Sequence, residues 1–161
     1  MRGHGFPNRL KSPPQKFAGL SLNERPAFIF TNNSSPLVTK LQKNHLAENQ
    51  LLNNCDIVSV AGAAKNIADP KETSDREFIL RQIDISKRLH GINEVVLMNH
   101  TDCGAYGDRD AFSSSLEEKN RHAEDMKTAG AIIKQKHPDL DIRAVLVNID
   151  KSGKIDFEAI S

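Results

Sequence analysis

A short apolar segment that runs directly into a loop containing histidine and cysteine constrains this chain more than any other feature. The segment Glu94–Asn99 (EVVLMN) is rich in aliphatic and β-branched residues, which predicts a buried strand. The sequence HTDCG, residues 100–104, follows at once, and its glycine permits a sharp turn. Zinc prefers imidazole and thiolate, and ligands of open α/β sheets lie beyond the carboxyl ends of strands. His100 and Cys103 are therefore candidate metal ligands, although a solvent-facing histidine and a small apolar cysteine would give the same pattern.

The length and composition of the chain are typical of one soluble globular domain. Its 161 residues contain 38% hydrophobic and 27% charged side chains. No apolar run reaches the length of a membrane span, and the N-terminus lacks the apolar core of a secretory signal. The two cysteines, Cys55 and Cys103, exclude a disulfide framework and favour a reducing, cytoplasmic setting.

Charge is distributed unevenly, although the formal net charge is only +1. The first 25 residues hold five basic side chains and one acidic one, together with several prolines. We therefore expect residues 1–25 to form an extended arm or tail, followed by a single domain at residues 26–161. A transit peptide is an alternative interpretation of such a leader. No later segment forms a basic stripe, and the chain has one tyrosine and no tryptophan, which gives nucleic-acid binding little support.

Strand-like and helix-like segments alternate along the rest of the chain. Strands are predicted at Pro26–Thr31, Asp56–Ala61, Glu94–Asn99 and Ile142–Ile149, with a hairpin-linked edge strand at Ile155–Ile160. Helices are predicted at about Leu37–Leu52, at Ser74–His90 and from Ser113–Ser115 to Lys136. The alternation predicts an α/β fold whose mainly parallel sheet is covered by helices on both faces.

The two clearest helices each have an apolar face that we expect to pack on the sheet. In the first helix this face consists of Phe78, Ile79, Ile83, Ile85 and Leu89. In the second helix it consists of Leu116, Ala123, Met126, Gly130 and Ile133. Gly91 and Pro138 follow these helices and are expected to end them.

The order of these elements and motifs resembles the β-class carbonic anhydrases over about Pro26–Ile160. The most specific part is Val95–Gly107, in which an apolar strand runs into H-x-x-C-G. The sequence VSVAG at residues 58–62 looks like the second strand of the family and the A-G turn that follows it.

The resemblance implies a three-layer fold with strand order 2-1-3-4 plus an edge strand. It also implies a homodimer or higher homo-oligomer whose sites lie near the subunit interface, with the basic N-terminal arm lying across the partner. The implied activity is zinc-dependent reversible hydration of CO2 to bicarbonate. His100 and Cys103 match two of the zinc ligands of the family, and Asp102 and Tyr106 would lie nearby in the loop.

The chain departs from the first motif of the family, C-x-D-x-R, which supplies a zinc ligand and an Asp–Arg pair. In the register that the resemblance implies, Asn32 occupies the cysteine position, Ser34 the aspartate position and Pro36 the arginine position. No other register helps, because residues 31–46 contain no Cys, Asp, Glu or Arg. Catalytic zinc normally needs three protein ligands and an open position for water. We therefore expect zinc to be weakly held or absent and CO2 hydration to be impaired; a catalytically inactive binding or structural subunit is the alternative.

Other side chains are weaker candidates for the missing ligand. Cys55 begins the second strand, whereas His100 and Cys103 follow the end of the third, so strands of about six residues would separate them by roughly 20 Å. Cys55 is therefore predicted to be a small buried apolar group. Asp102 lies inside the loop and either binds the metal, contributes to catalysis or simply faces water. His122 falls on the buried side of its helix, where we expect a core histidine that could also approach the site.

Overall fold

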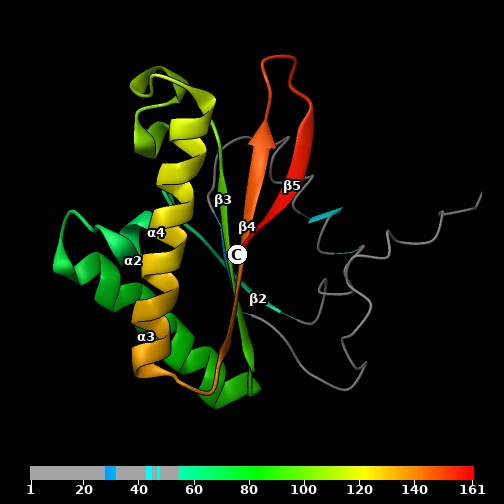
Figure 1. Ribbon diagram of the computed structural model, residues 1–161. Helices are drawn as coiled ribbons and strands as arrows, with labels where there is room; N and C mark the ends of the chain where they lie inside the picture. The colour runs from blue at the N-terminus through cyan, green and yellow to red at the C-terminus, as the bar shows by residue number, and fades with distance from the viewer. Residues whose placement is uncertain (1–27, 32–42, 45–46, 48–54) are drawn as a thin grey trace, which may run out of the picture.

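The computed structural model of the chain describes residues 28–31, 43–44, 47 and 55–161, and these form an α/β fold (Figure 1). The strands are β1 (Phe28–Thr31), β2 (Asp56–Ser59), β3 (Glu94–His100), β4 (Asp141–Ile149) and β5 (Ile155–Ile160). The helices are α2 (Lys65–Ala68), α3 (Thr73–His90) and α4 (Ser115–Lys136), with two short 3-10 helices, η2 (Gly104–Tyr106) and η3 (Arg109–Ala111). The predicted α/β class is therefore confirmed, while the described residues do not test whether helices cover both faces of the sheet.

The five strands form one sheet with the order β2-β1-β3-β4-β5. The first four of these strands are parallel, and β5 returns antiparallel to β4 through a hairpin. In the backbone register, Phe28 of β1 is level with both Asp56 of β2 and Val95 of β3. Pairing between β3 and β4 continues to the last residue of β3, where His100 lies beside Val147. This pairing fixes the height of His100 at the carboxyl end of the sheet.

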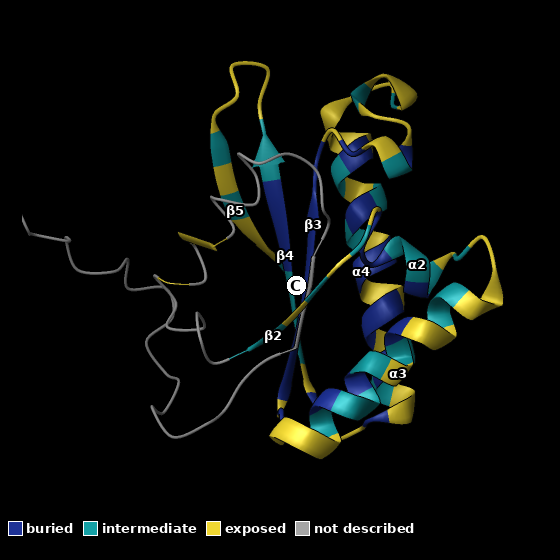
Figure 2. Cartoon of the chain, turned by 180° about the vertical axis from the view of Figure 1, so that it is seen from behind, coloured by how far each residue is buried: buried dark blue, intermediate teal, exposed yellow. Residues whose placement is uncertain are grey.

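Strand β3 lies in the middle of the sheet, and all seven of its residues are buried (Figure 2). Its side chains alternate between two apolar clusters. Val95 and Leu97 belong to the core beneath the helices, whereas Val96 and Met98 pack with residues of β4 on the opposite face. A strand buried on both faces needs an uninterrupted apolar sequence, which explains the pattern of this segment.

The described helices α2, α3 and α4 cover one face of the sheet, as Figures 1 and 2 show. Helix α3 contributes Ile79 and Ile83 to the core, and α4 contributes buried residues that include Met126 and Ile133. Gly130 lets α4 approach β4, because a Cβ atom at this position would lie 3.0 Å from Ile142. The predicted packing of both helices against the sheet is therefore confirmed for these residues.

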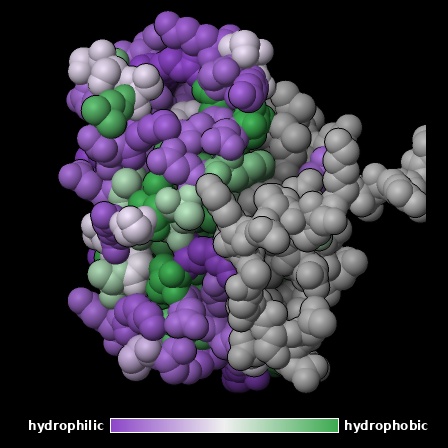
Figure 3. All heavy atoms as spheres, turned by 45° about the vertical axis from the view of Figure 1, so that its right-hand side comes forward, coloured by the Kyte–Doolittle hydropathy of each residue, from purple (hydrophilic) through white to green (hydrophobic). Residues whose placement is uncertain are grey.

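Three apolar side chains of the predicted helix faces are instead exposed: Phe78 (47%), Leu89 (62%) and Leu116 (68%). The buried side of α3 follows Ile79, Ile83 and Ser86, so Phe78 lies about 100° away from this row. Leu89 and Leu116 lie in terminal turns of their helices. On the face of the molecule drawn in Figure 3, hydrophobic side chains lie in small groups among hydrophilic ones. Helical periodicity found the correct faces here but overestimated their width.

Two predicted segments lie wholly or mostly outside the described residues. The arm at residues 1–25 is one of them, and the helix at about Leu37–Leu52 is the other. Within the second segment, the described residues Lys43, Asn44 and Ala47 are helical. None of the described helices has the length and apolar character of a membrane span.

Candidate metal centre

His100 and Cys103 both lie at the carboxyl end of β3 and are almost completely buried, with 2% of each residue exposed. Cys103 directly precedes η2, and its carbonyl oxygen accepts hydrogen bonds from the N–H groups of Tyr106 (2.8 Å) and Asp108 (3.1 Å). The chain therefore turns sharply at the cysteine. The structure places both predicted ligands at the edge of the sheet where open α/β folds bind ligands.

The contacts of the His100 ring fix its tautomer. Its Nδ1 atom lies 2.6 Å from the carbonyl oxygen of Thr101, and a carbonyl oxygen can only accept, so Nδ1 carries the proton. Nε2 therefore keeps its lone pair, and it is buried with no hydrogen-bond partner in the described part of the chain. Burial lowers the pKa of His100, against the opposing effects of the Thr101 carbonyl and the charges of Asp102 and Glu118. A neutral imidazole with its other N–H held by a carbonyl is the form in which histidine binds metals.

Thr101 fastens the loop to β4. Its N–H donates to the carbonyl oxygen of Val147 at 3.0 Å, and its hydroxyl oxygen accepts from the N–H of Ile149 at 2.8 Å. The parallel pairing of β3 with β4 is therefore extended by one residue beyond His100.

Asp102 has a backbone φ of 59°, and its side chain is paired with Arg109. One carboxylate oxygen accepts from the backbone N–H of Arg109 at 3.1 Å, and the other lies 3.4 Å from the guanidinium group. Arg109 also donates to the carbonyl oxygen of Ile149 at 2.9 Å. The N–H of Asp102 donates to Oε1 of Glu118, a residue with only 1% of its surface exposed. Asp102 is thus both exposed and paired, and the loop carries an Asp–Arg pair of its own.

A buried polar network lies behind the loop, on the helix side of β3. Oδ1 of Asn99 accepts from the N–H of Ala64 at 3.1 Å, which identifies the other side-chain atom as Nδ2. Nδ2 then donates to the hydroxyl of Tyr106 at 3.0 Å and to Nδ1 of His122 at 3.2 Å. The Tyr106 hydroxyl in turn hydrogen-bonds to Asp125. This network ties together β3, the turn after β2, η2 and α4.

Two titratable groups of this network, Tyr106 and His122, are held neutral by burial. Burial, followed by the charge of Asp125, raises the pKa of Tyr106 far above its ordinary value. Burial, followed by the charges of His100 and Arg121, lowers the pKa of His122 to about 4. His122 is fully buried and its Nε2 has no hydrogen-bond partner among the described residues. The prediction of a buried core histidine at this position is confirmed, with one ring nitrogen satisfied.

The turn after β2 contacts the metal-site loop closely. Gly62 has a φ of 81°, and a Cβ atom there would lie 3.1 Å from the Cβ of Ala105. Lys65 donates to the carbonyl oxygen of Ala105 at 2.8 Å and lies 5.0 Å from the centre of the Tyr106 ring. The glycine of the A-G sequence is therefore needed for both its backbone conformation and its small size.

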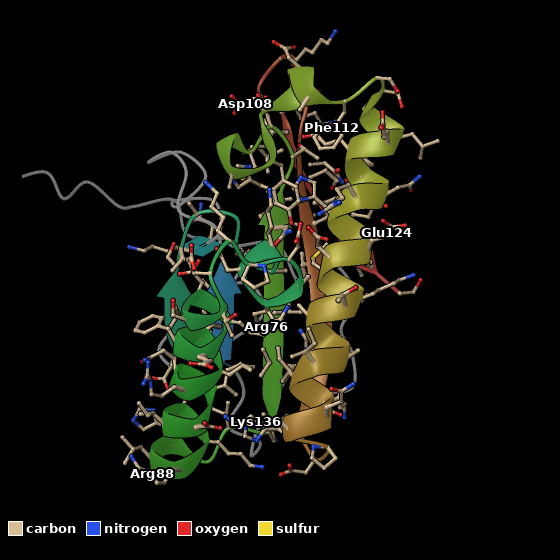
Figure 4. All side chains as sticks on the ribbon, turned by 90° about the vertical axis from the view of Figure 1, so that its left-hand side faces the viewer. Arg76, Arg88, Asp108, Phe112, Glu124 and Lys136 are labelled. Atoms are coloured by element: carbon tan, nitrogen blue, oxygen red, sulfur yellow. The ribbon has the colours of Figure 1, made fainter. Side chains whose placement is uncertain are left out.

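A pocket of about 670 Å³ opens between the loop and the first half of α4. Its lining includes Tyr106, Phe112 and Glu124, the last two of which are labelled in Figure 4. His100 and Cys103 do not line this pocket. It therefore lies beside the candidate metal centre and is separate from it.

The third ligand of a zinc site is not found in the described part of the chain, where no three metal-binding side chains come together. Asn32, Ser34 and Pro36, which occupy the positions of the first motif, lie outside the described residues. Cys55 is level with the start of β3, so six residues separate it from the height of His100, or roughly 20 Å. It is half-buried against the apolar cluster on the face away from the helices, and burial raises its pKa.

Sequence reasoning missed three side chains that shape this site: Asn99, Arg109 and Glu118. A signal for Glu118 was present, because positions 118, 122, 126, 129 and 133 follow one helical row that is otherwise buried. Asn99 could have been found because it is a polar residue at the end of an otherwise apolar segment. No local pattern marks Arg109, whose partners are seven and 40 residues away.

The chain and its fold resemble known proteins. A family model described as "Putative carbonic anhydrase" matches residues 38–158. An uncharacterized protein of Rickettsia bellii is 32% identical over 98 residues, which are 59% of this chain and 60% of that protein. Another from Rickettsia conorii is 32% identical over 103 residues, which are 62% of this chain and 55% of that protein. The chain thus matches little more than half the length of these two relatives.

A solved structure shares the fold. The crystal structure of carbonic anhydrase from Streptococcus mutans superposes with a TM-score of 0.55 and 21% sequence identity. The match covers 89% of this chain and 87% of that one, and at this identity it concerns the fold alone. The family model covers most of the chain and includes the H-x-x-C-G loop. The chain therefore belongs to the β-class carbonic anhydrase family.

Proposed function

We propose that the chain binds zinc through His100 and Cys103 and retains at most a reduced capacity to hydrate CO2 reversibly to bicarbonate. The observation that carries this proposal is the state of the His100 ring. Its Nδ1 proton is held by the Thr101 carbonyl, and its buried Nε2 lone pair has no hydrogen-bond partner among the described residues. A buried lone pair without a partner is unfavourable, and a metal ion would satisfy it.

The residues of the site have separate tasks in this proposal. Zinc, when bound, supplies the Lewis acidity that activates water for attack on CO2. His100 and Cys103 would hold the ion, and the buried apolar side chains of β3 keep bulk water away from one side of it. The carboxylate of Asp102, held by Arg109, is a candidate for orienting a polar group at the site. It would partly replace the Asp–Arg pair of the missing first motif.

A second candidate function is a binding or structural subunit without catalysis. The absence of any Cys, Asp, Glu or Arg from residues 31–46 favours it, because the first loop then supplies no anionic ligand. A homodimer is proposed in both cases, and CO2 and bicarbonate are substrates only in the first. The two candidates differ in turnover and agree in retaining the H-x-x-C loop.

Zinc affinity of the purified chain tests the proposal, measured by competition with a chromophoric chelator. We expect one zinc per chain and much weaker binding by His100→Ala and Cys103→Ser. Cys55→Ser is the matched control, because it removes the other thiol, which lies at the opposite end of the strands. Failure of the wild type to bind zinc, or equal affinity in Cys103→Ser, would overturn the proposal. Stopped-flow CO2 hydration by the zinc-loaded chain then separates the reduced enzyme from the inactive subunit.

A further inference from the structure

The residue between the two proposed ligands has a backbone conformation that needs support. Asp102 has a φ of 59°, in the left-handed region that residues other than glycine rarely adopt. Such conformations persist where the surrounding structure imposes them, and they are frequent at ligand sites. The H-x-x-C loop therefore depends on contacts made from outside its own sequence.

Glu118 of α4 supplies one of these contacts from an unusual position for a carboxylate. Only 1% of the residue is exposed, and its Oε1 accepts the N–H of Asp102 at 2.5 Å. Glu118 forms no ion pair with any residue in the described part of the chain. Burial of an unpaired carboxylate is unfavourable, so the contacts that remain must offset it. These are the hydrogen bond from Asp102 and the N-terminal end of α4, because Glu118 lies in the first turn of that helix.

Arg109 supplies the second contact, to the side chain of Asp102. Its backbone N–H donates to Oδ1 of Asp102 at 3.1 Å, and its guanidinium lies 3.4 Å from Oδ2. The same guanidinium donates to the carbonyl oxygen of Ile149, at the end of β4. The Asp102 backbone is thus held by α4, while its side chain is held by a residue that is anchored to the sheet.

We propose that Glu118, with Arg109 as its counterpart, is a positioning residue that holds the loop between His100 and Cys103 in the conformation needed to bind one metal ion. The inference rests on the proposed function, since metal binding is the property that the positioning serves. Neither residue touches the metal in this proposal. Both act through Asp102, whose conformation sets the direction of the two flanking ligands.

The variants Glu118→Ala and Glu118→Gln separate the hydrogen bond from the charge, because glutamine keeps an acceptor oxygen. Glu124→Ala is the control, since it removes an exposed carboxylate from the same helix. We expect Glu118→Ala to weaken zinc binding by about 10- to 100-fold, the range typical of residues that support metal ligands. Glu118→Gln should retain most of the affinity, and Glu124→Ala all of it. In the cobalt-substituted chain, the intensity of the thiolate-to-metal absorption band should rank the variants in the same order as their zinc affinity.

A readout that needs no metal keeps the inference separate from the proposed function. In the metal-free chain, hydrogen exchange of the Asp102 amide should be slow in the wild type and in Glu124→Ala but fast in Glu118→Ala. If the wild type binds no zinc, the proposed function fails, and this exchange comparison alone decides the positioning role. The inference would be overturned if Glu118→Ala bound zinc as tightly as the wild type and its Asp102 amide exchanged as slowly.

Arg109→Ala provides an independent variant at a more accessible position, which tests the inference even if Glu118→Ala does not fold. We expect it to weaken zinc binding and to quicken exchange at Asp102, in the same direction as Glu118→Ala. Unchanged zinc affinity and unchanged Asp102 exchange in Arg109→Ala would show that Arg109 does not position the loop.

Discussion

The side-chain amide of Asn99 donates a hydrogen bond of 3.0 Å to the hydroxyl of Tyr106, seven residues further along the chain. Both proposed zinc ligands, His100 and Cys103, lie between these two residues. The hydrogen bond therefore closes the base of the metal-site loop. It is buried and belongs to a network that extends to α4, so the loop is held by the helix layer as well as by the sheet.

Tyr106→Phe should lower the free energy of unfolding by about 1–3 kcal/mol, because it removes a partner from buried polar groups of Asn99 and Asp125. Urea denaturation followed by circular dichroism measures this change. Asn120→Ala is a suitable control, since it truncates an exposed polar side chain of α4 and should change stability by less than about 0.5 kcal/mol. Equal stability of Tyr106→Phe and the wild type would show that the network contributes nothing.

His122 should make the stability of the chain depend on pH between about 6.5 and 4. The pKa of His122 is about 4 in the folded chain and near 6.5 in the unfolded one, so only the unfolded state takes up a proton in this window. The free energy of unfolding is therefore highest above pH 6.5. It should fall as the pH decreases to 4, by up to about 3 kcal/mol from this residue.

The variant His122→Gln tests this contribution, because glutamine does not titrate. Urea denaturation at a series of pH values should give a shallower decrease for the variant than for the wild type across the window. The residual slope would report other groups, including His100, whose pKa is lowered by burial in the same direction. Parallel curves for the two proteins would contradict the assignment.

Gly62→Ala should destabilise the chain more than Gly153→Ala. Both glycines have a φ of 81°, so alanine is strained at either position by about 1–2 kcal/mol. At Gly62 the added Cβ would also lie 3.1 Å from Ala105, whereas at Gly153 nothing lies within 4 Å. The difference between the two free energies of unfolding therefore measures the close approach of the A-G turn to the loop. A difference near zero would mean that the two segments separate easily.

Asn32→Cys should strengthen zinc binding by more than about 100-fold, which exceeds the effect of residues that only support ligands. The physical reason is that a thiolate would complete a three-ligand set. This change alone should restore little CO2 hydration. Addition of Ser34→Asp and Pro36→Arg should raise turnover, because these residues would rebuild the Asp–Arg pair of the first motif. Rapid CO2 hydration by the zinc-loaded wild type in stopped-flow assays would contradict the expectation that turnover needs the restored first motif.

Light scattering at micromolar concentration should report twice the chain mass. Residues 1–25 carry a net charge of +4 against a net negative remainder, which suggests an arm that binds the partner subunit. Removal of these residues should therefore weaken association of the subunits. The loss should be larger at low ionic strength than at high ionic strength. Equal association by the shortened chain would exclude the arm while leaving the dimer intact.

The five strands and helices α3 and α4 could be predicted from local patterns because each one satisfies a local requirement, whereas the short helix α2 was not predicted. Ser114 caps α4 with its side chain, and Gly91 ends α3 with a φ of 65°, as their positions in the sequence indicated. The exposure of Phe78 and Leu116 could not be predicted in this way. It depends on where each helix sits relative to the sheet, which the periodicity of a single helix does not contain.

The candidate site was predictable only in part, for a similar reason. The sequence H-x-x-C-G identifies His100 and Cys103 because their spacing is local. The support of the loop comes from contacts with long sequence separation, such as Asp102 with Glu118 and Arg109 with Ile149. Single-sequence patterns do not report such pairs, since Asp102, Arg109 and Glu118 each resemble an ordinary charged surface residue.

The side chains of β3 alternate between the two faces of the sheet, so its last two residues, Asn99 and His100, lie on opposite sides. Asn99 lies on the helix side with Leu97, whereas His100 continues the row of Val96 and Met98 on the other side. Replacement of the His100 side chain should therefore leave the hydrogen bonds of Asn99 beneath the helices in place. A chain with this architecture could lose the histidine ligand and still keep a folded domain. The same separation would allow a different metal-binding side chain to be introduced at position 100 without rebuilding the core.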